Sequence, residues 1–165
     1  MYSKKVMEHF KNPKNLGRIE NPDGIGKVGN VVCGDLLHLY IKVGKKEKNE
    51  IIKDVKFETY GCTAAIATSS MITELVKGKT LEKAANIKKD DIVKALGGLP
   101  SIKIHCSVLA VDALSEAVYD YLSKNYRKIP NELMKKHGRN VQEKEIVQEK
   151  YKDWIGNQEQ MRKHK

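Results

Sequence analysis

Residues 54–76 read DVKFETYGCTAAIATSSMITELV, and the hydrophobic period changes partway through this stretch. Up to residue 59 charged side chains alternate with apolar or β-branched ones, which predicts a half-buried strand. From Ala64 onward the apolar residues recur about every four positions until Gly78, which predicts an amphipathic helix. The change falls at Gly61 and Cys62. The stretch therefore predicts a strand that runs directly into a helix, with a cysteine at the junction.

The residues before this stretch predict more strands. Residues 37–43 alternate in the same way, so they are expected to pair antiparallel with residues 54–59 across a lysine-rich turn at residues 44–49. A third strand is predicted at residues 28–32. Residues 21–29 are rich in Asn, Pro, Asp and Gly and are expected to be irregular.

Helical patterns lie on both sides of these strands. A short helix is predicted over residues 3–10 and a longer one over residues 107–121. Thr80 and Asp90 are expected to cap two further short helices at their N-termini. Leu99 is expected to be extended because it precedes Pro100.

The length of 165 residues suits one domain followed by a tail. Residues 127–165 are rich in lysine and glutamate, and their apolar side chains are too sparse for a separate core. We expect a helical or disordered extension there, or a segment that contacts a partner. Those apolar side chains are Met134, Val141, Ile146, Trp154 and Ile155.

The net charge of +10 would suit nucleic acid, but lysines and acids are interspersed and arginine occurs at only four positions. Nucleic-acid binding is therefore disfavoured. No apolar run approaches a membrane span, so no membrane contact and a cytoplasmic location are expected. Thiols stay reduced in the cytoplasm, and three cysteines then indicate ligands, catalysis or simple burial rather than disulfides.

The local settings of the three cysteines are more informative than their spacing. Cys33 precedes a predicted strand, whereas Cys62 and Cys106 lie at predicted helix N-termini, where the helix dipole favours the thiolate. Asp35 and His105 lie nearby in the sequence. If the loops converge, three sulfurs and one harder ligand would suit either Zn²⁺ or a 2Fe-2S cluster, and not Mg²⁺ or Ca²⁺. Burial as small apolar side chains is the alternative.

Four segments up to about residue 126 resemble the IscU/NifU family of iron-sulfur assembly scaffolds. They are Tyr2–Phe10 with Asn12 and Pro13, Gly29–Asp35, Tyr60–Met71, and Leu99–Ser107. The resemblance implies a scaffold domain over residues 1–126 with an α+β fold, in which helices pack on a small three-stranded antiparallel sheet. It also implies that Cys33, Cys62 and Cys106 meet at one end, beside Asp35 and His105.

The resemblance further implies a non-enzymatic function. A cysteine desulfurase would supply sulfur as a persulfide, iron would be added as Fe²⁺, a 2Fe-2S cluster would form on the three cysteines, and acceptor proteins would receive it. Zn²⁺ could occupy the same ligands. A heat-shock chaperone pair would bind the segment Leu99, Pro100, Ser101, Ile102 and Lys103, in which the family's usual second proline is replaced by serine. The chain could be a monomer or a homodimer.

Individual roles follow from the same resemblance. Cys106 is the first choice for the persulfide acceptor, with Cys62 as the alternative. Asp35, a harder ligand than thiolate, is expected to keep the cluster labile. Lys103 would favour a nearby thiolate or contact the chaperone. The alternative function is a zinc-bound sulfurtransferase of the SufU type, which His105 and the absence of an insertion before Cys106 disfavour.

Overall fold

A computed structural model describes residues 1–31, 33–150 and 152. Within these ranges no helix is long and apolar enough to cross a membrane. The elements follow in the order α1 Lys4–Lys11, β1 Gly24–Gly29, β2 Leu36–Lys46, β3 Asn49–Tyr60, α2 Thr63–Val76, α3 Leu81–Ala85, α4 Lys89–Ala95, a 3-10 turn at Ser101–Lys103, α5 Ile104–Lys124 and α6 Asn131–Lys150.

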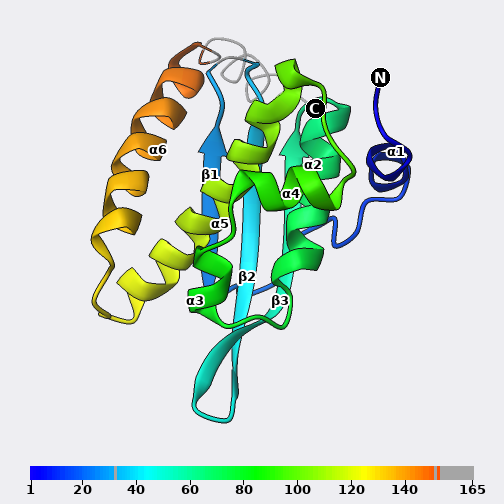
Figure 1. The fold of residues 1–165 in the computed structure, drawn as a ribbon. Coiled ribbons are helices and arrows are strands. Elements are labelled where there is room, and N and C mark those ends of the chain that lie inside the picture. The colour runs from blue at the N-terminus through cyan, green and yellow to red at the C-terminus, as the bar shows by residue number, and fades with distance from the viewer. Residues whose placement is uncertain (32, 151, 153–165) are drawn as a thin grey trace, which may run out of the picture.

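The predicted α+β architecture is confirmed. The three strands form an antiparallel sheet in the order β1-β2-β3. Leu39 and Phe57 are opposite each other in the register and fully buried, as the alternation in β2 and β3 predicts. Helices α2 and α5 cover this face of the sheet (Figure 1).

The junction at Cys62 also forms as predicted. Strand β3 ends at Tyr60, and Cys62 is the N-cap residue of α2. Most of α2 is buried, and its small side chains let neighbouring elements approach closely. Helix α1 packs against it, and Ser70 Oγ lies 2.7 Å from His9 Nδ1. The Ala-, Ser- and Thr-rich sequence of α2 therefore allows this helix to be buried immediately after Cys62.

Strand β1 corrects two predictions. Residues 24–29 form a strand where irregular backbone was expected, and the strand ends before residues 30 and 31. Its glycines provide space: a Cβ at Gly26 would lie 1.9 Å from the Ala113 carbonyl oxygen and 2.8 Å from the Ala117 nitrogen. Helix α5 thus crosses β1 with almost no side chain between the two backbones. Glycine normally indicates a turn, so this use could not be inferred locally.

The caps of the short helices were predicted with mixed success. The Thr80 side chain accepts a hydrogen bond from the Lys83 amide at 3.2 Å, as expected for an N-cap. Asp90 is not a cap, because α4 begins at Lys89 with Lys88 in the N-cap position, two residues earlier than predicted. The Asp91 carboxylate accepts a hydrogen bond from the Lys88 amide instead.

The described part of the C-terminal extension is helical and packs against the domain. Helix α6 lies beside β1 and α5 (Figure 1). The apolar residues named there from the sequence, Met134, Val141 and Ile146, are exposed, whereas Leu133, Asn140 and Val147 are buried. Trp154 and Ile155 lie outside the described residues.

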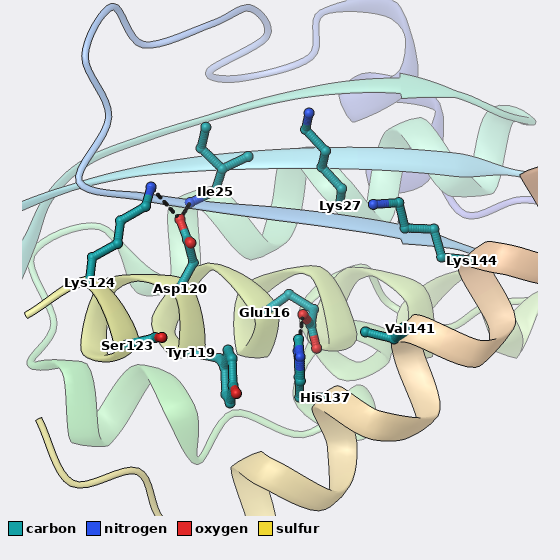
Figure 2. A pocket seen from close by; sticks show the side chains of 10 residues that line it. All are labelled: Ile25, Lys27, Glu116, Tyr119, Asp120, Ser123, Lys124, His137, Val141 and Lys144. Carbon is teal, nitrogen blue, oxygen red and sulfur yellow. Dashed lines mark hydrogen bonds and ion pairs between the residues drawn. The ribbon is translucent and has the colours of Figure 1, made fainter. Parts of the chain in front are cut away.

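Polar contacts dominate the α5–α6 interface. Glu116 on α5 accepts a hydrogen bond from the Asn140 amide at 3.1 Å and lies 2.7 Å from His137 Nδ1. The His137 ring stacks on Tyr119 with 3.8 Å between ring centroids. Figure 2 shows Glu116, Tyr119 and His137 along a cavity of about 340 Å³ between β1, α5 and α6. This cavity is separate from the cysteines.

Candidate metal centre

Three separate segments bring sulfur and oxygen donors together. Cys62 Sγ and Cys106 Sγ lie 3.8 Å apart, and each is 3.9 Å from Asp35 Oδ2. Two thiolates bound to one tetrahedral Zn²⁺ at about 2.3 Å would lie about 3.8 Å apart. The two sulfurs therefore already have the separation that a shared metal ion requires.

A second group of donors overlaps the first at Asp35. Donor atoms of Cys33, Asp35 and His105 all lie within 4.8 Å of one another, as do those of Asp35, Cys62 and Cys106. His105 Nε2 is buried without a hydrogen-bond partner. A buried, unpaired imidazole nitrogen is costly unless it binds a ligand, so its position fits a metal donor. Every donor expected from the sequence is thus present in one cluster.

The described residues 30, 31 and 33–35, here called the Cys33 loop, place Cys33 and Asp35. The Asn30 amide donates to the Asp35 carbonyl at 2.9 Å, and the Gly34 amide donates to the Asn30 carbonyl at 2.8 Å. Gly34 has a φ of +72°, which glycine adopts at little cost. The closed loop leaves Cys33 exposed and buries the Asp35 side chain.

Gly61 and Thr68 were not singled out from the sequence, yet both shape the site. A Cβ at Gly61 would lie 3.0 Å from the Asp35 carboxyl carbon and 2.6 Å from Ala65 Cβ, so only glycine leaves room for Asp35. Thr68 Oγ1 donates to the Cys106 carbonyl at 3.2 Å and ties α2 to α5. Thr68 is fully buried, and a threonine among the small and apolar residues of the predicted helix was its signal in the sequence.

Lys103 and His105 lie near different cysteines of the centre. Residues 101–103 form a 3-10 turn that ends at Lys103, whereas His105 lies in α5, which begins at Ile104. Residues two apart in a helix point in different directions. His105 groups with Cys33, whereas the pKa of the exposed Lys103 ammonium is raised chiefly by the charge on Cys62.

Cys106 corrects the expectation of an activated thiolate. It lies within the first turn of α5 rather than before the helix, and it is 1% exposed. Burial raises the pKa of the Cys106 thiol, and the neighbouring Cys62 and Asp35 raise it further. Partial desolvation, together with the Asp35 side chain, raises the pKa of Cys33 to about 11. Without metal, both thiols hold their protons at neutral pH.

These raised pKa values predict a pH-dependent affinity for metal. Because Zn²⁺ binds thiolates, it must displace the protons of Cys33 and Cys106, and the affinity rises as pH rises toward their pKa values. We expect the logarithm of the association constant to increase by about one per pH unit near neutrality for each cysteine that binds Zn²⁺ and releases its proton. Competition titrations with a zinc chelator would measure this slope. Cys33→Ser should reduce it by about one, and an unchanged slope would contradict the ligand role of Cys33.

The chaperone segment predicted from the sequence borders this centre. Leu99 and the N-terminal Tyr2 pack against the small apolar cluster that contains Cys106. Ile102 is 76% exposed on the following turn. Within this segment, Leu99 therefore packs beside the centre, whereas Ile102 faces solvent.

Comparison with known proteins places these residues in a family. The family model described as the NifU-like N terminal domain matches residues 1–128. The chain belongs to this family. Every donor of the centre, from Cys33 to Cys106, lies within the matched residues, whereas α6 lies beyond them.

Named relatives agree with this membership. The iron-sulfur cluster assembly scaffold protein IscU 1 of Archaeoglobus fulgidus is 59% identical over 125 residues, which cover 76% of this chain and 79% of the relative. IscU of Escherichia coli K12 is 50% identical over 130 residues, covering 77% and 98%. A crystal structure of FiSufU from Fervidobacterium islandicum AW-1 has a TM-score of 0.55 at 24% identity, over 71% of this chain and 96% of that one, and shares the fold.

Proposed function

We propose that this chain is a scaffold on which an iron-sulfur cluster is assembled and from which it is released. The observation that carries the proposal is the convergence of Cys33, Cys62 and Cys106 with Asp35 and His105 from separate segments. Soft thiolates favour iron-sulfur clusters and Zn²⁺ over hard cations. The relatives named as iron-sulfur assembly scaffolds support the same function.

The grouping of the donors favours a cargo with two metal ions. A tetrahedral ion takes four ligands, whereas five donors are present in two groups that share Asp35. A 2Fe-2S cluster takes two protein ligands on each iron. We assign Cys62 and Cys106 to one iron, and Cys33 with His105 or Asp35 to the other. Zn²⁺ would use a subset of the same donors.

Sulfur would enter as a persulfide from a cysteine desulfurase. The sulfur atom of the receiving cysteine attacks the outer persulfide sulfur, the S–S bond of the donor breaks, and the donor thiolate is released. Cys106 is the proposed first acceptor and Cys62 the alternative. Cys62 is the more accessible of the two and has the Lys103 ammonium beside it. Mass spectrometry of trapped persulfides in Cys62→Ala and Cys106→Ala proteins would separate them.

The completed cluster would pass to acceptor proteins. A chaperone pair would promote this step by binding Leu99–Lys103, where Ile102 is exposed for contact. A chaperone that bound this turn would contact the residues just before α5, and it could thereby displace His105 and Cys106 in the first turn of that helix. Ile102→Ser is therefore expected to weaken chaperone-stimulated transfer without changing cluster formation.

Asp35 is proposed to keep the cluster transferable. A carboxylate is a weaker partner than thiolate for a soft cluster, so its presence lowers the barrier to release. Asp35→Ala should slow transfer to an apo-ferredoxin about tenfold, followed by circular dichroism of the acceptor's cluster. Asp90→Ala, which removes an exposed carboxylate on α4, is the control and should transfer normally. Faster transfer from Asp35→Ala would contradict this role.

The deciding experiment is anaerobic reconstitution of the full chain with Fe²⁺, cysteine and a cysteine desulfurase. The proposal expects about one 2Fe-2S cluster per site, measured by iron, sulfide and absorption spectra. A protein that retains only Zn²⁺ and passes persulfide onward without forming a cluster would instead be a sulfurtransferase of the SufU type. That outcome would overturn the scaffold function.

A further inference from the structure

Helix α6 contacts the strand that leads into the Cys33 loop. Val147, near the end of α6, is 2% exposed. A Cβ added at Gly29 would lie 3.3 Å from Val147 Cβ and Cγ2 and 3.1 Å from Leu36 Cδ2. The Val147 side chain therefore packs directly on the bare backbone of Gly29, the last residue of β1.

Gly29 lies at the base of the Cys33 loop. It pairs with Leu36, and this is the last pair of residues in the β1–β2 ladder. Six residues separate them in the sequence, and the described ones among these form the Cys33 loop. Two backbone hydrogen bonds, Asn30 to Asp35 and Gly34 to Asn30, hold the loop closed. Val147 thus packs on the residue pair, Gly29 and Leu36, that closes the base of the Cys33 loop.

The other contacts of α6 attach it to α5, the helix that carries Cys106. Arg139 Nη2 donates to Asp112 Oδ1 at 3.0 Å, and His137 lies 2.7 Å from Glu116. Figure 2 shows the His137–Glu116 contact between the two helices. Buried residues follow at seven-residue spacing along one face of α6, at Leu133, Asn140 and Val147. Helix α6 is therefore attached to α5, which carries Cys106, and to β1, which leads into the Cys33 loop, whereas Cys62 lies at the start of α2.

We propose that α6 braces the metal centre by holding the Cys33 loop in a fixed position relative to Cys106, and that it thereby slows release of the bound metal or cluster. The effect on a cluster rests on the scaffold function proposed above, but the effect on the loop does not. Helix α6 begins beyond residues 1–128, so the brace is an addition to the family domain. Val147 is a positioning residue in this proposal, because it contacts no donor itself.

The test uses the full chain with Val147→Ala, which removes two buried methyl groups and leaves a small cavity at Gly29. In metal-free protein, amide hydrogen exchange of Asn30 and Gly34 should become about five- to tenfold faster by NMR. Release of Zn²⁺ to a chromogenic chelator in stopped flow should become about three- to tenfold faster. Gly29→Ala, which crowds Val147 and Leu36, should shift both rates in the same direction.

Two further variants make the result specific. Ile146→Ala removes a 59% exposed side chain from the same helical turn and should leave both rates unchanged. Val147→Ile keeps the apolar contact and should retain slow exchange and slow release. Unchanged exchange at Asn30 and Gly34, or unchanged Zn²⁺ release, in Val147→Ala would overturn the proposal. Failure of the wild-type protein to form any cluster, with these rates still responding, would overturn only the scaffold function.

Discussion

Cys106→Ala protein is expected to emerge from anaerobic reconstitution without the absorption bands of a 2Fe-2S cluster. Cys106 Sγ lies at the buried side of the centre, within 4 Å of both Cys62 Sγ and Asp35 Oδ2. Thiolate binding to structural Zn²⁺ totals about 10–16 kcal/mol, so one of four ligands accounts for about 3 kcal/mol. Zn²⁺ affinity should therefore also fall about 100-fold or more.

A matched control separates ligand loss from disruption of α5. Ser107 is the next residue, is also buried, and donates a hydrogen bond to the Ile104 carbonyl at 2.5 Å. Ser107→Ala removes one buried atom from the same turn without removing a proposed donor, so cluster yield should stay near that of the wild type. A normal cluster spectrum in Cys106→Ala would remove Cys106 from the ligand set.

Gly26→Ala is expected to lower the free energy of unfolding by about 3 kcal/mol or more. The added methyl would meet the Ala113 carbonyl oxygen at 1.9 Å, and neither the strand nor the helix backbone can move away as a side chain could. Helix α5 would have to separate from β1, which disturbs the packing behind Cys106. Urea unfolding of metal-free protein would measure the loss.

Gly138→Ala is the matched control for this prediction. Gly138 lies inside α6, and an added Cβ would meet nothing within 4 Å. Alanine is favoured over glycine in a helix interior by up to about 1 kcal/mol, so this variant should be as stable as the wild type or more stable. Equal unfolding midpoints for the two variants would show that β1 and α5 are not held as closely as described.

Much of the fold could be predicted because its patterns are local. The alternation around Leu39 and Phe57 indicated a half-buried sheet, and the change of period at Cys62 indicated the strand-to-helix junction. Strand β1 was missed because its glycines are used for contact with α5, and a glycine that makes space looks the same in sequence as a glycine that makes a turn. The packing of α6 was missed because Asn140 and charged pairs replace a continuous apolar stripe.

The candidate site, like the fold, was only partly predictable from the sequence. The sequence and its family resemblance predicted the donor residues, and the structure shows that these residues lie close together. The sequence indicated that the helix dipole would lower the pKa of Cys106, whereas in the structure this pKa is raised. The helix N-terminus was visible in the sequence, whereas the burial that outweighs it comes from elements distant in the chain.

By itself, the sequence determined which atoms are available to a metal and which local turns present them, because donor type and hydrophobic period are properties of neighbouring residues. Only the tertiary structure decided how far apart the sulfurs lie, which thiols keep their protons, and that α6 is attached both to the Cys33 side and to the Cys106 side of the centre. These properties depend on solvent exclusion and on contacts between distant segments, which no local pattern records.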